Sequence, residues 1–297
     1  KRIVVLGSGD IGLIMARRLT WEGAKVEAVL EILPFPSGLT RNIVQCLNDQ
    51  GIPLYLSHTV VDIHGEERVR GVTVARVDSN LRPIPGTEWD IECDTLLLSV
   101  GLIPENELTQ DVGGELDHVT GGPVVTDEME TSTPGIFACG NVVHIHDLVD
   151  NVTREAWTAG EGAARLVAGQ QPGGDTVRTR AGDGIRYVVP HVLHLDNLAS
   201  RDVRLFMRAT RPAERVRVEA VVGGEVVFSK FERVVRPAEM VMLTIPAGKV
   251  SPGKMGPNRA GLNKASPDCA DGGPQPELAV RITPRDRDSA AEGGEKA

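Results

Sequence analysis

The sequence predicts an α/β protein with a parallel sheet in its N-terminal part and a small antiparallel β domain in its C-terminal part. Three observations support this class. Short apolar runs alternate with helix-like segments over residues 1–100, as in a parallel sheet whose strands are buried on both faces. A glycine-rich loop directly follows the first of these runs. Beyond residue 183 apolar and polar residues alternate one by one, which is the period of antiparallel strands.

The length and composition of the chain indicate two or three units and a small-molecule substrate. The chain has 297 residues, of which 41% are hydrophobic, and a net charge of -9. No run of Lys and Arg interrupts this acidic balance, so we expect neither a nucleic-acid partner nor an anionic-membrane surface. The apolar stretch at 94–104 is shorter than the roughly 20 residues that span a bilayer, and no signal peptide opens the chain. We therefore expect a cytoplasmic protein.

The glycine-rich loop lies between a predicted strand, 2–6, and a predicted helix. Gly7, Gly9 and Gly12 form the pattern GxGxxG. In a dinucleotide-binding loop the first glycine allows a tight turn, the second lets the backbone approach a pyrophosphate, and the third lets helix and strand pack closely. The helix N-terminus adds free N–H groups and the positive end of a dipole. The predicted cofactor-binding residues of this loop are Gly7, Ser8, Gly9, Asp10, Ile11 and Gly12.

An acidic residue ends the second predicted strand, 25–31. Glu31 stands where a dinucleotide-binding unit hydrogen-bonds the adenine ribose 2′-OH, and its charge would repel a 2′-phosphate. The sequence therefore favours NAD over NADP. The alternative is a glycine turn in an unrelated α/β unit, but the strand, the helix and the acid together favour nucleotide binding.

The remaining elements complete a Rossmann-like, NAD-binding domain over residues 1–100. We expect a helix over 39–51 and a strand over 52–58. A small antiparallel insertion includes 68–78, and a last parallel strand returns at 95–100.

Two later segments carry a family resemblance together with the glycine loop. They are 94–108 (DTLLLSVGLIPENEL) and 131–150 (TSTPGIFACGNVVHIHDLVD). With these motifs in this order, the chain resembles, over roughly residues 1–170, the pyridine-nucleotide-linked flavoprotein oxidoreductases that include the disulfide reductases. In that family an NAD-binding domain interrupts an FAD-binding domain, so the two are nested. The resemblance implies that residues 101–172 form the C-terminal part of the FAD domain.

The resemblance implies FAD and NAD as cofactors and hydride transfer between nicotinamide and flavin as the reaction. Gly101 matches the glycine of the family's crossover segment, and Gly140 and Asn141 lie in its late FAD motif. We expect these three residues to contact cofactor. The family has an aspartate where this chain has Asn141, which can hydrogen-bond a hydroxyl or phosphate oxygen but carries no charge. The sequence predicts no particular catalytic residue.

The family's FAD domain begins with its own glycine loop well before the nicotinamide-binding one, and no such loop precedes Gly7 here. We expect a truncated sequence, or a subunit that a second chain or a homodimer completes. The prediction is an FAD- and NAD(P)-dependent oxidoreductase with a small-molecule or protein electron donor or acceptor. Two alternatives stay open: a non-catalytic nucleotide-binding or electron-transfer subunit of a larger complex, and an NAD-dependent dehydrogenase without flavin.

Three side chains of metal-binding type, His144, His146 and Asp147, lie close together in the sequence. A metal site needs three or four converging ligands, and the sequence shows no second cluster, so we predict no metal site. The alternatives for the histidines are a structural role, or a place in the flavin and substrate cavity where an imidazole could move a proton during hydride transfer.

A polar, glycine-rich linker over 172–184 precedes the predicted antiparallel β domain, 183–250. Gly223 and Gly224 predict a two-residue hairpin between two of its strands. We expect a small β-sandwich with a binding, interface or structural role rather than a catalytic one. Residues 251–297 are rich in Gly and Pro and predict a disordered tail, with one added strand in the segment ELAVRIT as the alternative.

Overall fold

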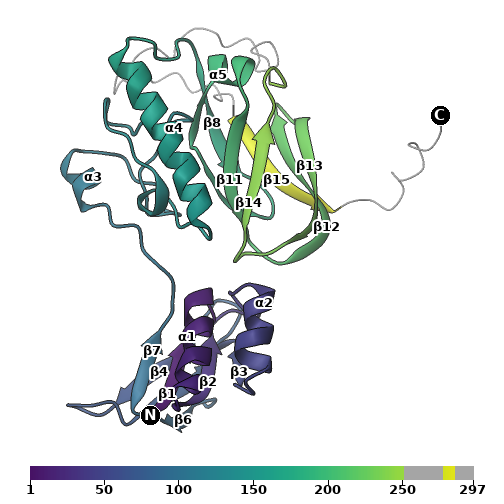
Figure 1. Cartoon of the computed structure of the whole chain (residues 1–297). Helices are drawn as coiled ribbons and strands as arrows, with labels where there is room; N and C mark the ends of the chain where they lie inside the picture. The colour runs from purple at the N-terminus through teal and green to yellow at the C-terminus, as the bar shows by residue number, and fades with distance from the viewer. Residues whose placement is uncertain (251–276, 285–297) are drawn as a thin grey trace, which may run out of the picture. The chain divides into compact units, whose positions relative to one another are not determined.

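The computed structural model describes residues 1–250 and 277–284 and divides the chain into two compact units, Lys1–Leu102 and Ile103–Ala297. Each unit has apolar cores of its own and is described by itself (Figure 1).

A four-stranded parallel sheet forms the first unit, as the alternation of strands and helices predicts. Its strands lie in the order β3-β2-β1-β7, and every neighbouring pair runs parallel. Val4 and Val5 of β1 point to opposite faces of the sheet and are both fully buried, which is why β1 reads as an unbroken apolar run. The elements are β1 Arg2–Leu6, α1 Asp10–Trp21, β2 Lys25–Glu31, β3 Leu54–Leu56 and β7 Thr95–Leu98.

Helices cover one face of this sheet. Leu13 and Ala16 of α1 share a core with Val5 and with the buried thiol of Cys46. The single helix expected over 39–51 has two parts in the structure, because its second half is wound as a π-helix. These parts are α2 Thr40–Ile43 and η1 Val44–Asn48.

A three-stranded antiparallel sheet covers the other face. Its order is β4-β5-β6, and Val72 and Val74 of β5 share a core with Val4. This is the antiparallel insertion that the alternating segment 68–78 predicts. The strands are β4 His58–His64, β5 Gly71–Arg76 and β6 Trp89–Glu92.

One long helix, α4, follows mostly irregular chain in the second unit. It turns Glu155, Ala159 and Gly162 towards the interior, where all three are buried. Gly162 is required there, because a Cβ atom at this position would lie 2.6 Å from the carbonyl oxygen of Glu128. The elements of this part are α3 Glu107–Asp111, η2 Gly140–Val142 and α4 Val149–Val167.

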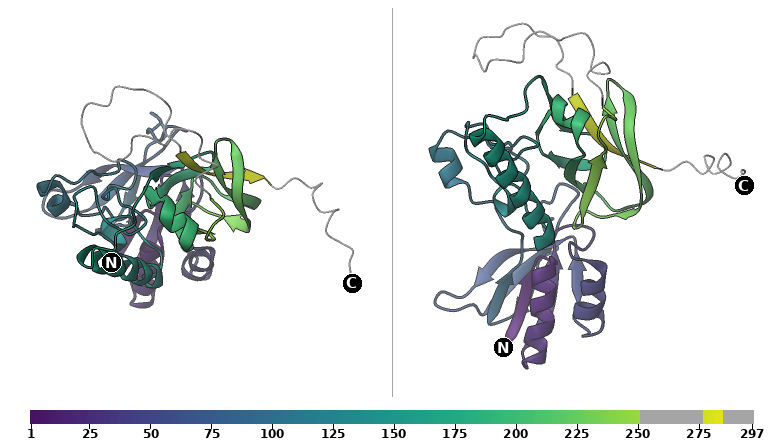
Figure 2. Two further views of the ribbon diagram at one scale, coloured as in Figure 1. Left: turned by 90° about the horizontal axis from the view of Figure 1, so that it is seen from above. Right: turned by 45° about the horizontal axis from the view of Figure 1, so that its top comes forward.

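Two sheets packed around one apolar core complete the second unit (Figures 1 and 2). One has the strand order β10-β8-β15-β12-β13 and the other β14-β11-β9. Leu205 and Met207 from one sheet and Val218 and Leu278 from the other are fully buried in the shared core, so this part is sandwich-like, as predicted. The elements are β8 Thr176–Ala181, β9 Ile185–Val189, β10 Val192–His194, α5 Leu195–Ser200, β11 Val203–Ala209, β12 Ala213–Val222, β13 Glu225–Val235, β14 Met240–Ile245 and β15 Glu277–Pro284.

The last described strand, β15, lies within the segment 251–297 for which the sequence predicts a tail. It pairs antiparallel with β12 and parallel with β8, so it lies inside the five-stranded sheet. The strand that the segment ELAVRIT offered as an alternative is therefore present. The rest of the predicted tail, 251–276 and 285–297, lies outside the described residues.

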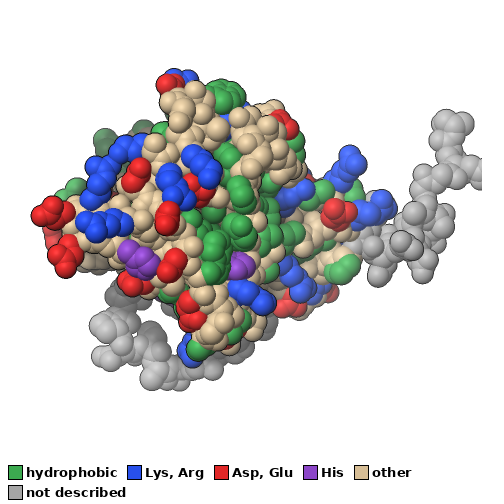
Figure 3. Space-filling view, turned by 90° about the horizontal axis from the view of Figure 1, so that it is seen from below, with side chains coloured by type: hydrophobic (Ala, Val, Ile, Leu, Met, Phe, Trp, Pro, Cys, Tyr) green, Lys and Arg blue, Asp and Glu red, His purple; other side chains and the backbone are tan. Residues whose placement is uncertain are grey.

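Charged side chains of both signs lie on the surface of the protein. On the face drawn in Figure 3, Lys and Arg side chains are interspersed with Asp and Glu side chains. Among the described helices, none is both long and apolar enough to cross a bilayer.

Candidate functional site

Packing against β7 requires two of the three loop glycines. Gly7 has a φ of +95°, and a Cβ atom there would lie 2.1 Å from the carbonyl oxygen of Ser99. At Gly12 a Cβ atom would lie 2.6 Å from the Ser99 side chain. Gly9 differs, since the nearest atoms to a Cβ at this position are 3.6 Å away. Packing therefore tolerates a Cβ atom at Gly9 and does not require glycine there, whereas a dinucleotide-binding loop uses this glycine to bring its backbone close to a pyrophosphate.

The N-terminus of α1 presents unused hydrogen-bond donors beside Gly9. Gly9 is the N-cap residue and has no side chain to cap the helix. Within the described part of the chain, the structure gives the N–H groups of Gly9, Asp10 and Ile11 no acceptor. The Gly12 N–H donates to Ser99 Oγ at 3.0 Å. Free donors and the positive end of the helix dipole together suit an anion such as a phosphate.

Glu31 holds the glycine loop against the loop that follows β2. The carboxylate is buried and accepts hydrogen bonds from the Ser8 backbone N–H at 3.1 Å and from Ser8 Oγ at 2.5 Å. It also accepts from Ser37 Oγ at 2.7 Å and from the Leu33 N–H at 3.0 Å. The sequence predicts only a ribose contact for this residue. The structure adds an organising role, because one carboxylate fixes both loops at the end of the sheet.

Asp10 makes a second link between the same two loops. Its Oδ1 accepts from the Leu39 N–H at 2.8 Å and from Asn42 Nδ2 at 2.7 Å. The carboxylate is therefore engaged by the segment after β2. Ile11, the last of the predicted loop residues, exposes 72% of its surface at the start of α1.

The other three predicted cofactor-binding residues lie in different units. Gly101 belongs to the first unit and has a φ of +106°. Gly140 and Asn141 belong to the second unit. The Gly140 N–H donates to Glu155 Oε2 at 2.8 Å, and Asn141 Oδ1 accepts from the backbone N–H of His146 at 3.0 Å. Asn141 is exposed, so its amide NH₂ group remains available to a ligand.

The two histidines that follow converge on a carboxylate that sequence reasoning missed. His144 Nε2 lies 2.7 Å from Glu155 Oε1, and His146 Nε2 lies 3.0 Å from Glu155 Oε2. All three side chains are buried, with exposed fractions of 1%, 1% and 3%. Asp147 does not join them, because its carboxylate pairs with Arg208 and accepts from the Met240 N–H. Only the folding of α4 back onto the segment after η2 brings Glu155 to the histidines.

Burial and pairing shift the pKa values in this region. Burial by itself raises the pKa of Glu155, but the hydrogen bond from His144 and the pairing with His146 outweigh it and lower the pKa to about 2. Burial lowers the pKa of His144 despite the bond to Glu155. His191 has its pKa lowered to about 4, chiefly by burial. Near neutral pH the cluster therefore holds an ionised carboxylate.

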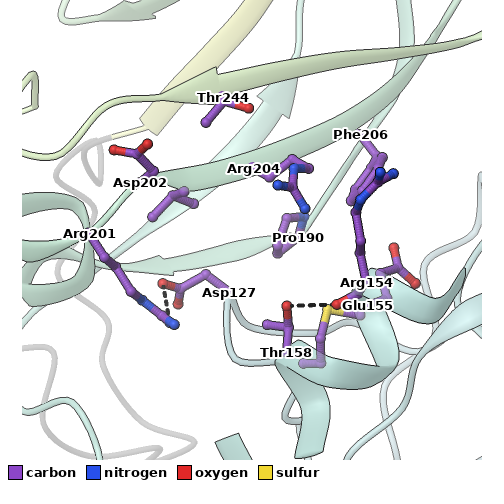
Figure 4. A pocket seen from close by; sticks show the side chains of 12 residues that line it. Asp127, Arg154, Glu155, Thr158, Pro190, Arg201, Asp202, Arg204, Phe206 and Thr244 are labelled. Carbon is purple, nitrogen blue, oxygen red and sulfur yellow. Dashed lines mark hydrogen bonds and ion pairs between the residues drawn. The ribbon is translucent and has the colours of Figure 1, made fainter. Parts of the chain in front are cut away.

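A cavity of about 230 Å³ lies in the second unit between α4 and the strand β11 (Figure 4). Glu155 forms part of its wall, as does Phe206, whose ring contacts the rings of both His144 and His146. Arg201 crosses one side to pair with Asp127 at 3.6 Å. Of the three clustered residues, Glu155 is therefore the one that lies at the cavity wall.

A parallel sheet, a sterically required glycine loop and a helix end with free N–H groups together define a dinucleotide-binding unit. The family comparison agrees with this class. The model of the pyridine nucleotide-disulphide oxidoreductase family matches residues 1–162, and the chain belongs to this family. The predicted family is therefore confirmed; use of FAD and NAD(P)H and oxidoreductase activity are properties of its members.

Individual relatives match more than half of the chain. A dihydrolipoyl dehydrogenase from Pseudomonas aeruginosa is 33% identical over 175 residues, 58% of this chain and 34% of that protein. An NADH oxidase from Methanocaldococcus jannaschii is 28% identical over 178 residues, 58% of this chain and 36% of that protein. Among solved structures, a T. acidophilum thioredoxin reductase is 26% identical with a TM-score of 0.48, covering 57% of this chain and 53% of that one. The chain spans about a third of the length of these curated relatives.

Proposed function

We propose that the chain acts in an NAD(H)-linked, FAD-dependent oxidoreductase, with its first unit binding the nicotinamide nucleotide. The observation that carries this proposal is a glycine at position 9 that packing does not require, next to the unused N–H groups of Asp10 and Ile11. A pyrophosphate at this helix end would accept hydrogen bonds from these groups without displacing any protein acceptor. When bound, the cofactor pair supplies hydride exchange between nicotinamide and flavin.

The chain's own residues have distinct roles in this proposal. Gly7 and Gly12 fix the loop against Ser99, and Gly9 leaves room for the pyrophosphate. Glu31 holds Ser8 in place and meets the adenine ribose with a negative charge. Each of these roles binds or orients the nucleotide and leaves the electronic chemistry to the cofactors.

Toward FAD, the chain offers the exposed amide of Asn141 in the second unit. Its Oδ1 is already engaged by the backbone of His146, which fixes the side chain and leaves the NH₂ group as a donor. A ribityl hydroxyl or a phosphate oxygen is a suitable acceptor. A neutral amide in place of the family's aspartate tolerates a phosphate oxygen better, because it adds no repulsion between like charges.

We expect the chain to bind NADH at least about tenfold more tightly than NADPH, a difference of about 1.4 kcal/mol. The reason is that a 2′-phosphate would approach the Glu31 carboxylate, and the two negative charges repel. Isothermal titration of the purified chain with each nucleotide measures this preference. Equal affinities would remove the assignment of Glu31 to the ribose.

An absorbance spectrum of the same preparation tests the flavin part. Flavin bands that bleach when NADH is added would support hydride transfer by this chain. If NADH binds but added FAD does not, the chain supplies the nicotinamide site alone, and the flavin part of the proposal fails.

A further inference from the structure

We propose that His144, His146 and Glu155 form a binding site for one divalent transition-metal ion of the Zn²⁺ class. The three side chains each offer one ligand atom, and these atoms all lie within 4.8 Å of one another. The sequence argued against a metal because it showed only two histidines and an aspartate. Glu155 of α4 supplies the third converging ligand, which the sequence pattern around His144 and His146 does not contain.

His146 gives the second observation. Its side chain is 1% exposed, yet neither ring nitrogen has a hydrogen-bond partner of acceptable geometry among the described residues. Nε2 lies 3.0 Å from Glu155 Oε2, close enough for an ion pair but poorly directed for a hydrogen bond. A buried imidazole without a partner costs free energy, and a metal ion bound to its nitrogen removes that cost.

The surroundings hold the three ligands in place, as the outer contacts of metal sites do. Asn141 Oδ1 accepts from the backbone N–H of His146, and the Gly140 N–H donates to Glu155 Oε2. On the far side of the His144 ring, Nδ1 lies 3.5 Å from the hydroxyl of Tyr187. The ligand set is therefore positioned by the turn around Gly140 and by β9 of the sandwich.

The donor set selects the class of ion. Two imidazoles and one carboxylate suit Zn²⁺ and its first-row neighbours, whereas Mg²⁺ and Ca²⁺ prefer oxygen ligands only. Tetrahedral bonds of about 2.0–2.2 Å place two ligand atoms about 3.4 Å apart. The two histidine–carboxylate pairs here, at 2.7 and 3.0 Å, would open by about 0.7 and 0.4 Å to admit the ion.

The cavity lies on the Glu155 side of the cluster, so a fourth ligand such as a water molecule would approach the ion from that side. Three protein ligands and one open position are the arrangement of zinc sites that keep a water molecule. All three ligands belong to the second unit, and none lies in the glycine loop of the first unit.

Zinc binding to the whole chain tests the proposal. After metal is stripped with a chelator, titration with Zn²⁺ should give one ion per chain with a Kd in the micromolar range or tighter. Co²⁺ in place of Zn²⁺ should give visible absorption bands typical of nitrogen and oxygen ligands in a four- or five-coordinate site. Neither readout uses flavin, nucleotide or enzymatic activity.

Two variants and a matched control locate the ion. His146→Asn and Glu155→Gln should each weaken Zn²⁺ binding at least about tenfold, or about 1.4 kcal/mol. His118→Asn removes a histidine of the same unit whose side chain is 93% exposed, and it should bind as the unaltered chain does. Circular dichroism shows whether each variant folds.

Three results would overturn the site. They are less than one Zn²⁺ per chain, an affinity that His146→Asn leaves equal to that of His118→Asn, or a Co²⁺ spectrum without visible ligand-field bands. In that case the three residues form a hydrogen-bonded cluster with a structural role. If Glu155→Gln does not fold, His146→Asn and the Co²⁺ spectrum of the unaltered chain decide the question.

Discussion

Gly9→Ala is expected to raise the Kd for NADH by at least about tenfold, a loss of about 1.4 kcal/mol, while leaving the fold intact. Gly9 has a φ of -65°, which alanine adopts freely, and its Cβ would meet no protein atom closer than 3.6 Å. The methyl group instead occupies the space proposed for the pyrophosphate. Isothermal titration with NADH measures the loss, and thermal melting checks that the stability is unchanged.

Gly12→Ala is the matched control for Gly9→Ala, since it adds the same methyl group at the third residue of α1. Its Cβ would lie 2.6 Å from the Ser99 side chain, so the first unit must distort. Overpacking of this kind costs about 1–3 kcal/mol, and we expect a clear fall in melting temperature. If Gly9→Ala binds NADH as tightly as the unaltered chain, the nucleotide does not use this loop and the proposed function fails.

Acidification is expected to destabilise the second unit between pH 6.5 and 4 because of His191. Its Nδ1 accepts a hydrogen bond from the Val125 N–H at 3.1 Å, so the neutral imidazole fits the fold and the charged one does not. Burial, with smaller contributions from the charges of His144 and Arg178, lowers the pKa to about 4, and Asp117 only partly offsets this.

The sign follows from proton binding in the two states. The pKa of an unfolded histidine is about 6.5, so between that value and pH 4 the unfolded chain binds more protons than the folded one. The stability is therefore fully present above pH 6.5 and falls as the pH drops towards 4, by about 2 kcal/mol or more from this residue. Scanning calorimetry at several pH values measures the fall.

His191→Asn provides the control for this pH dependence. An asparagine can present an oxygen where Nδ1 lies and does not titrate in this range. We expect its stability to change less between pH 6.5 and 4 than that of the unaltered chain. Identical pH dependence in the two proteins would show that other groups cause the acid sensitivity.

Local sequence patterns predicted the glycine loop and the parallel sheet because they act over short distances. An unbroken apolar run, three glycines at fixed spacing and an acid at the end of the next strand fall within residues 1–31. Steric demand explains part of this signal, since a side chain at Gly7 or Gly12 would collide with Ser99. The family comparison confirmed the class that these residues indicate.

Local sequence patterns could not predict contacts between segments that lie far apart in the sequence. Glu31 was predicted as a ribose ligand, yet its buried hydrogen bonds to Ser8 and Ser37 arise only when two loops meet at the end of the sheet. The strand β15 was left as an alternative within a predicted tail, because its partners β8 and β12 lie far away in the sequence.

The sequence by itself determined the α/β class, the glycine loop between strand and helix, and the family, since each depends on residue type and short spacing. Only the tertiary structure decided what surrounds His144 and His146. In the structure Asp147 forms an ion pair with Arg208, away from the histidines. Glu155 of α4 instead lies in contact with both imidazoles. The physical reason is that burial and charge pairing depend on how α4 packs against its own unit, and no local pattern encodes that contact.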